Sequence, residues 1–124
     1  MTKDPAIRVV LLPRDTNSLG TIFGGIILSY IDQAGAVAVA KATAQRFVTV
    51  ALKEVVFKQP VRLGEVVSFY AEVIKVGRTS ITVEVDVEVN RGDGSVREVT
   101  EAQVTFVCIN AEGKPIPVEL RNKS

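Results

Sequence analysis

The chain has 124 residues, of which fifteen are basic and fourteen acidic, with one cysteine and no histidine. This length predicts one domain over residues 1–124, and the near-balance of charge argues against nucleic acid or an acidic membrane surface as a partner. Without histidine, a Ser-His-Asp triad and the usual zinc sites are excluded, so any chemistry must use carboxylates, amides, hydroxyls, backbone N–H groups or a borrowed cofactor. A lone cysteine, Cys108, and an N-terminus without an apolar leader favour a cytoplasmic protein, in which Cys108 is a small buried hydrophobe.

The first part of the chain predicts a short strand followed by a long helix. Residues 7–13 (IRVVLLP) form the strand, which ends at a proline, and a loop rich in turn residues follows. From about Phe23 to Ala44, the many alanines and a four-residue spacing predict a helix. Its length and hydropathy also approach those of a membrane span, but Tyr30, Asp32, Gln33 and three glycines argue against that alternative.

After the helix the hydrophobic period changes to two, which predicts strands. Phe47–Pro60 is apolar on both faces, so we expect a central strand. Val66–Val76 follows, and in Ile81–Asn90 apolar and polar residues alternate strictly, as in an antiparallel strand with one buried face. Val96–Ile109 is the last strand, and residues 111–124 are expected to be a fraying tail. The order β–α–β–β–β–β predicts an α+β fold in which one long helix covers an antiparallel sheet.

Asp32 is the only charged residue between Asp15 and Lys41. A carboxylate on an apolar helix costs several kcal/mol unless it finds partners or takes a proton. From the residues alone, an interface salt bridge explains it as well as a catalytic role does. In a catalytic role, the carboxylate would activate water or attack a carbonyl carbon directly.

Two features N-terminal to Asp32 also have both a catalytic and a structural explanation. Gly24 and Gly25 begin the expected helix, where unpaired N–H groups and the positive end of the helix dipole can hold an oxyanion. Their missing side chains would also allow close packing against the sheet. Asn17, in the preceding loop, fits a turn residue or a helix cap, and its amide could instead orient a water molecule or a substrate.

Four segments together resemble the hotdog-fold acyl-CoA thioesterases. They are RDTNSLGTIFGGIILSYIDQAGAVAVAKA (14–42), VTVALKEVVFKQPVRLGEVV (48–67), IKVGRTSI (74–81) and EAQVTFVCIN (101–110). The nearest type is the bacterial short-to-medium-chain acyl-CoA hydrolase, which is similar to the brain acyl-CoA hydrolases, and the resemblance covers nearly the whole chain. It implies the hotdog fold, in which an antiparallel sheet wraps one long helix. It also implies hydrolysis of acyl-CoA to a carboxylic acid and coenzyme A, with no metal and no bound cofactor.

The resemblance implies a role for each matching residue. Asp32 matches the helix acid that serves as general base or nucleophile, and Asn17 matches an amide that faces this acid across a dimer interface. The segment whose backbone N–H groups polarise the thioester carbonyl matches Phe23, Gly24 and Gly25. A turn that contacts coenzyme A matches Gly77, Arg78, Thr79 and Ser80.

The resemblance also implies a homo-oligomer, at least a dimer and usually a hexamer built as a trimer of dimers. Two other functions are alternatives to acyl-CoA hydrolysis. A hotdog dehydratase would use a histidine, which this chain lacks. A non-catalytic acyl-CoA-binding or sensor protein would need a second effector domain, for which we expect no residues. For Arg78, an ordinary solvated turn arginine is the alternative to a clamp for the phosphates of coenzyme A.

Overall fold

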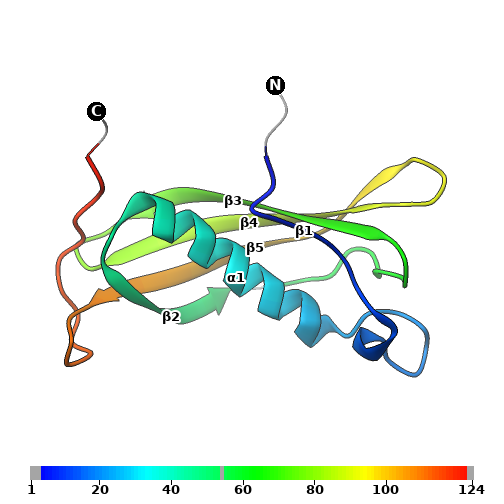
Figure 1. The fold of residues 1–124 in the computed structure, drawn as a ribbon, viewed down its shortest axis with the longest axis horizontal. Helices are drawn as coiled ribbons and strands as arrows, with labels where there is room; N and C mark the ends of the chain where they lie inside the picture. The colour runs from blue at the N-terminus through cyan, green and yellow to red at the C-terminus, as the bar shows by residue number, and fades with distance from the viewer. Residues whose placement is uncertain (1–3, 54, 123–124) are drawn as a thin grey trace.

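The structure is a computed structural model that describes residues 4–53 and 55–122, in which a long helix lies across a five-stranded sheet (Figure 1). The helix α1 is Gly24–Ala42, and the strands are β1 (Ile7–Val10), β2 (Arg46–Lys53), β3 (Val66–Val76), β4 (Ser80–Asn90) and β5 (Val96–Ile109). The strands lie in the order β1-β3-β4-β5-β2, and every neighbouring pair is antiparallel. The predicted α+β architecture is therefore confirmed.

The core lies between α1 and the face of the sheet that the helix covers. On β4 the alternate residues are fully buried, as the period of two predicted; they are Ile81, Val83, Val85, Val87 and Val89. The helix supplies one buried stripe, made of Ile27, Ile31, Ala34, Gly35 and Val39. A Cβ on Gly35 would come within 3.0 Å of the Phe106 ring. The missing side chain therefore lets α1 lie close to β5.

The prediction of a central strand over Phe47–Pro60 was wrong. Among the described residues, β2 pairs only with β5, so it is an edge strand. The strand spans Arg46–Lys53. Residues 55–60 are not in a strand, and Glu54 lies outside the described residues. Much of its apolar surface is exposed, including Val48, Val50 and Leu52. An apolar pattern cannot tell a central strand from an edge strand that a second chain could cover.

Other predicted boundaries needed smaller corrections. β1 ends at Val10, before the expected proline, because Pro13–Asp15 forms a 3-10 turn. The helix ends at Ala42, two residues earlier than expected, and β3 and β5 have the predicted bounds. Within the described ranges, no helix is both long enough and apolar enough to cross a membrane.

The expectation of a fraying tail over residues 111–124 was also wrong for its described part, which ends at residue 122. We call residues 115–121 the C-terminal strap. The backbone N–H of Arg121 donates to the Ala42 carbonyl at 2.8 Å, and its guanidinium donates to the Ala40 carbonyl at 3.1 and 3.2 Å. These carbonyls lie in the last turn of α1, where intrahelical partners are missing and a cation is favoured. The strap therefore caps the helix.

Candidate active site

Asp32 lies in the third turn of α1, on the flank that faces the edge strand β2. It is partly buried, and the Thr49 hydroxyl donates a hydrogen bond to its Oδ1 atom at 2.6 Å. The register of β2 against β5 shifts between Thr49 and Ala51, which leaves Val50 as the extra residue of a β-bulge. Bulges are common beside active sites because they redirect a side chain. The lone acid of the helix thus has a specific partner on the edge strand.

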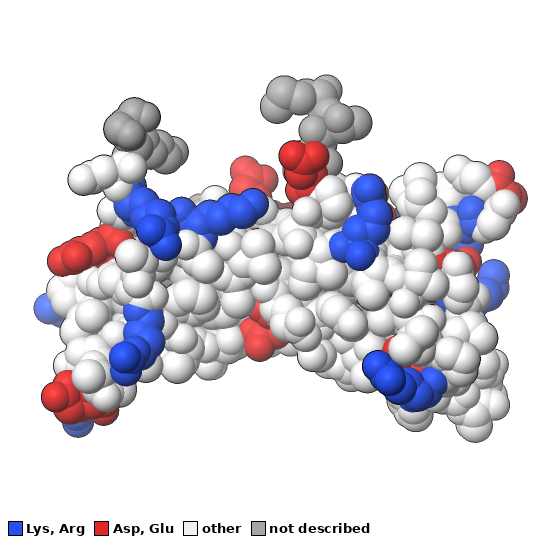
Figure 2. Space-filling model, viewed as in Figure 1, with Lys and Arg blue, Asp and Glu red and all other residues white. Residues whose placement is uncertain are grey.

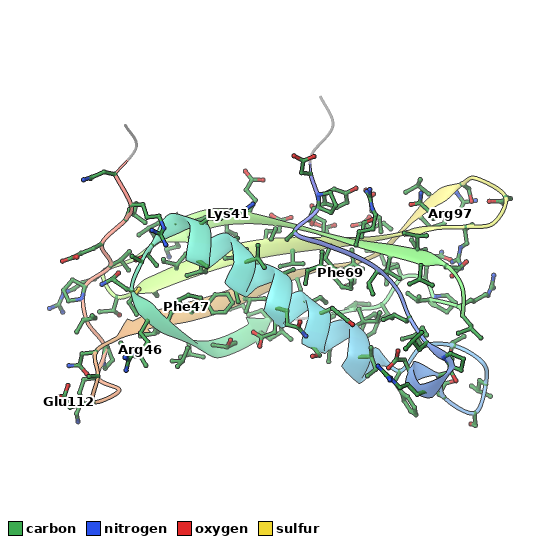
Figure 3. The ribbon with its side chains drawn as sticks, in the orientation of Figure 1. Lys41, Arg46, Phe47, Phe69, Arg97 and Glu112 are labelled. Atoms are coloured by element: carbon green, nitrogen blue, oxygen red, sulfur yellow. The ribbon has the colours of Figure 1, made fainter. Side chains whose placement is uncertain are left out.

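Thr49 is a site residue that the sequence prediction missed. It lies two residues after Phe47, whose ring meets the Phe106 ring edge to face at 5.5 Å (Figure 3). The one available signal was a hydroxyl at an inward position of an otherwise apolar strand. Among the described residues, Thr49 supplies the only hydrogen bond to Asp32. One carboxylate oxygen is therefore fixed, and the other is left to accept a proton or to attack carbon.

The N-terminus of α1 has two backbone donors without partners. Phe23 is the N-cap residue, half-exposed, and no side chain caps the helix. The N–H of Ile26 donates to the Phe23 carbonyl, whereas no hydrogen bond among the described residues uses the N–H of Gly24 or Gly25. A Cβ on Gly25 would meet nothing within 4 Å, and one on Gly24 would lie 3.3 Å from the Phe57 ring. Unpaired N–H groups at a helix N-terminus attract an anion, and the space beside Gly25 is open to one.

Asn17 uses its side chain inside its own loop. Its Nδ2 donates to the Thr21 hydroxyl at 2.9 Å, and its Oδ1 accepts the N–H groups of Leu19 (2.8 Å) and Thr21 (3.2 Å). It is thus a turn-forming residue and not the helix cap, which is Phe23. Within the described part of one chain, no hydrogen bond joins Asn17 to Asp32.

A single chain separates the predicted base from the predicted oxyanion donors. Asp32 follows Gly25 by seven residues in one continuous helix, and a rise of 1.5 Å per residue places them about 10 Å apart along its axis. A base and an oxyanion donor must each lie within about 3 Å of the reacting groups of one substrate. The predicted oxyanion donors of one chain therefore lie about two helical turns from the Asp32 of that chain.

The predicted coenzyme A turn connects β3 and β4. The Gly77 N–H donates to the Ser80 carbonyl at 2.8 Å, and a Cβ on Gly77 would lie only 2.6 Å from the Ser80 hydroxyl, which favours glycine there. The Thr79 carbonyl accepts the Cys108 N–H. Arg78 is exposed, and its guanidinium has no hydrogen bond to any described residue. Figure 2 shows basic side chains gathered near the C-terminal end of the chain, at the end of the molecule that holds this turn.

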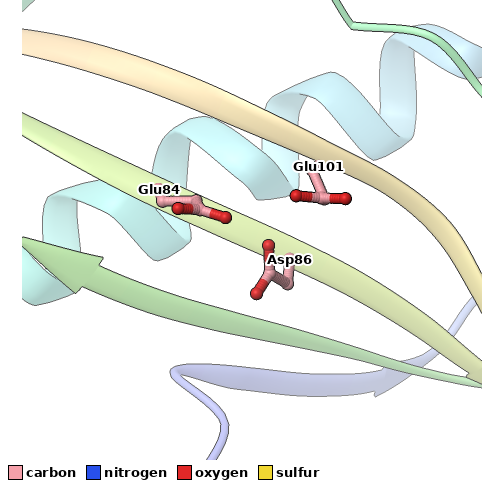
Figure 4. Close-up of side chains that lie close together, drawn as sticks. All are labelled: Glu84, Asp86 and Glu101. Carbon is pink, nitrogen blue, oxygen red and sulfur yellow. The ribbon is translucent and has the colours of Figure 1, made fainter. Parts of the chain in front are cut away.

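An acidic cluster lies on the opposite face of the sheet from α1 (Figure 4). Carboxylate oxygens of Glu84, Asp86 and Glu101 come within 4.8 Å of one another. The negative charge of Asp86 raises the pKa of the Glu84 carboxyl above its ordinary value, and Lys58 lies 3.4 Å from Glu101. Carboxylates this close can bind a divalent cation, but exposed acidic groups often cluster without one. Since the sheet separates this cluster from Asp32, we give it no part in the reaction.

The sheet order, the long helix and the acid on that helix together describe the hotdog class of thioester-processing proteins. The family model described as thioesterase superfamily matches residues 19–95. The acyl-CoA thioester hydrolase YciA of Escherichia coli K12 is 36% identical over 122 residues, which cover 94% of this chain and 92% of that protein. The chain belongs to the hotdog-fold acyl-CoA thioester hydrolases, as its motifs predicted.

Two solved structures extend the comparison. The hexameric hotdog-fold thioesterase Cj0915 of Campylobacter jejuni is 45% identical, with 94% of this chain and 91% of that chain covered and a TM-score of 0.87. The acyl-CoA hydrolase of Staphylococcus aureus, in complex with butyryl-CoA, coenzyme A and coenzyme A disulfide, is 28% identical, with 92% and 70% covered and a TM-score of 0.84. A structure of the Staphylococcus enzyme with one aspartate changed to alanine also matches. The predicted hotdog fold is thereby confirmed.

Proposed function

We propose that this protein hydrolyses acyl-CoA in an active site shared by two copies of the chain, with Asp32 as general base or nucleophile. The observation that carries the proposal is the 2.6 Å hydrogen bond from Thr49, which fixes one oxygen of an acid about 10 Å from its own helix N-terminus. As a base, Asp32 takes a proton from the water that attacks the thioester carbonyl. As a nucleophile, it forms a mixed anhydride that water then opens. Either route ends in a carboxylic acid and the coenzyme A thiol.

The second copy supplies the groups that one chain places too far from Asp32. In this arrangement, the partner subunit's Gly24 and the partner subunit's Gly25 donate to the oxyanion that forms on the thioester. Losing one such donor costs about 3–4 kcal/mol of transition-state stabilisation in other enzymes. The partner's Asn17 lies beside the same thioester, where its free Nδ2 hydrogen orients the water or the carbonyl.

The exposed edge of β2 supports this arrangement. An unpaired strand with exposed apolar side chains is a template for pairing with another chain, and β2 exposes Val48, Val50 and Leu52. Thr49 on the same strand contacts Asp32, so a copy paired along β2 lies next to the acid. We therefore place the dimer contact along β2. Three such dimers would give a hexamer like that of the Campylobacter thioesterase.

Release of a free thiol from acyl-CoA tests the activity itself. We expect turnover on a panel of acyl-CoA substrates that differ in chain length, and the panel also measures the length preference. A non-catalytic acyl-CoA-binding protein is the alternative function. Such a protein would bind the acyl-CoA substrates, which calorimetry would detect. It would release thiol no faster than the substrates release it spontaneously in the absence of protein.

Thr49→Val should lower kcat about tenfold, because a hydrogen bond to a charged group is worth about 1.5–3 kcal/mol and valine keeps the shape but loses the donor. Thr49→Ser is the matched control, since serine keeps the hydroxyl and should retain most of the activity. Steady-state assays of both variants measure the difference. Equal activity of the valine and serine variants would show that the bond to Asp32 does not matter for turnover.

The Gly77–Ser80 turn is proposed to contact the phosphates of coenzyme A, because Arg78 presents an exposed guanidinium that has no hydrogen bond to a described residue. Arg78→Ala should raise KM for acyl-CoA about tenfold, with little change in kcat, since it removes binding that is uniform along the reaction. Acyl-pantetheine, which lacks the nucleotide, should respond little. Arg97→Ala, at the other end of the molecule (Figure 3), is the control. Equal losses with both substrates would mean that the turn shapes the site without binding phosphate.

A further inference from the structure

We propose that the C-terminal strap is a positioning element for the coenzyme A turn: it fixes the peptide group of Arg78, and with it the point from which the arginine side chain reaches the phosphates. The inference rests on the proposed contact between this turn and coenzyme A. The strap passes beside the β3–β4 turn and the end of α1 (Figure 1).

The strap is an extended chain, so its N–H groups point alternately to two sides. One side faces the sheet and its turn, and the other faces the end of α1, so the strap joins the two. Two donate toward the sheet and its turn, and two donate toward the end of α1. These bonds are Ile116 to the Cys108 carbonyl (2.9 Å), Val118 to the Arg78 carbonyl (2.8 Å), Glu119 to the Gln45 side chain (2.8 Å) and Arg121 to the Ala42 carbonyl (2.8 Å).

The turn depends on two neighbours for its backbone contacts. The hairpin's own hydrogen bond runs from the Gly77 N–H to the Ser80 carbonyl. The carbonyls of the two residues between them, Arg78 and Thr79, accept hydrogen bonds from outside the hairpin. The Thr79 carbonyl accepts an N–H from β5, whereas the Arg78 carbonyl accepts the N–H of Val118 in the strap. The strap therefore fixes the peptide group of Arg78 itself.

Fixing this peptide before the ligand arrives should strengthen binding. Ordering a residue costs backbone entropy, and a preorganised contact avoids that cost at the moment of binding. The side chain of Arg78 is exposed and has no hydrogen bond to a described residue, so the strap limits the position of the Arg78 backbone, from which the side chain extends, and leaves the side chain itself free to turn. Because the turn would contact only the nucleotide end of the substrate, the effect should appear in KM and not in kcat.

The helix side of the strap is anchored independently of the turn. The Gln45 side chain donates to the Pro117 carbonyl and accepts the Glu119 N–H, both at 2.8 Å. The Thr43 hydroxyl donates to the Glu119 carbonyl at 2.7 Å. Removing the single bond from Val118 to Arg78 should therefore leave the strap in place and release only the turn.

Val118→Pro removes this bond, because proline has no N–H and is compatible with extended backbone; it also replaces a half-buried side chain that packs against the core with a ring of similar size. One lost hydrogen bond of about 1 kcal/mol corresponds to a KM for acyl-CoA about fivefold higher, and we expect kcat and the KM for acyl-pantetheine to stay near wild type. Leu120→Pro is the matched control: the Leu120 N–H makes no hydrogen bond within the described chain, and its side chain is exposed. It should behave like wild type with both substrates.

A double variant separates failure of this inference from failure of the proposed contact. If the strap acts through Arg78, Val118→Pro adds nothing to the KM of Arg78→Ala. An additive increase, or an Arg78→Ala effect without any Val118→Pro effect, overturns the strap inference alone. An Arg78→Ala variant with wild-type KM overturns the coenzyme A contact, and the positioning role falls with it.

Gln45→Leu provides a second variant if Val118→Pro does not fold. It removes both side-chain bonds of Gln45 to the strap and keeps the Val118 N–H. A loosened strap should again raise KM for acyl-CoA while kcat and the KM for acyl-pantetheine hold. Unchanged KM in this folded variant would contradict the inference.

Discussion

Asp32→Asn should reduce hydrolysis of acyl-CoA by at least about 10²-fold, as expected when a general base is lost, and leave a folded protein. An amide still accepts the hydrogen bond from Thr49, so the local packing is preserved. It can neither take a proton from water at neutral pH nor attack a thioester carbon. Steady-state thiol release measures the loss, and circular dichroism with size-exclusion chromatography verifies the fold and the assembly.

Asp93→Asn is the matched control for this substitution. Asp93 is exposed in the β4–β5 hairpin, where its Oδ1 accepts the N–H and the hydroxyl of Ser95. An asparagine keeps both acceptor contacts, so this variant should turn over at the wild-type rate. If Asp32→Asn were equally active, the acid would have no place in the mechanism. It would then return to the structural explanation of a partly buried interface residue.

A mixture of Asn17→Ala and Asp32→Ala subunits should recover about a quarter of wild-type activity, although each homodimer alone is nearly inactive. The reason is that a two-fold dimer with composite sites segregates the defects. In a mixed dimer, one site collects both substitutions and the other collects neither. Random reassembly of equal amounts makes about half of the dimers mixed, and each of these has one intact site of two.

Subunit exchange is the condition of this experiment, and mass spectrometry of the mixture measures it independently. Unmixed samples of each variant, taken through the same dissociation and reassembly, serve as controls. If exchange is complete and the activity stays at the level of the single variants, Asn17 and Asp32 do not share a site. Asn17 would then act only as the turn former that its bonds to Leu19 and Thr21 describe.

The candidate site divides into a part that local sequence could identify and a part that it could not. Asp32 stands out because it is the one charge in a long apolar stretch, and Gly24 and Gly25 stand out at the start of the same helix. These signals are local, so a motif can carry them. Thr49 carries no such signal, because its contact with Asp32 depends on how β2 lies against α1 and on the bulge at Val50.

The sequence by itself determined the element order and the buried face of β4, because a period of two is a property of neighbouring positions along the chain; which stripe of α1 is buried became known only from the structure. Only the tertiary structure decided that β2 is an edge strand, that Thr49 binds Asp32 and that the strap joins Arg78 to Ala42. Each of these depends on which distant segments lie side by side. The apolar faces of a strand specify that it must be covered, and the assembled sheet alone determines what covers it.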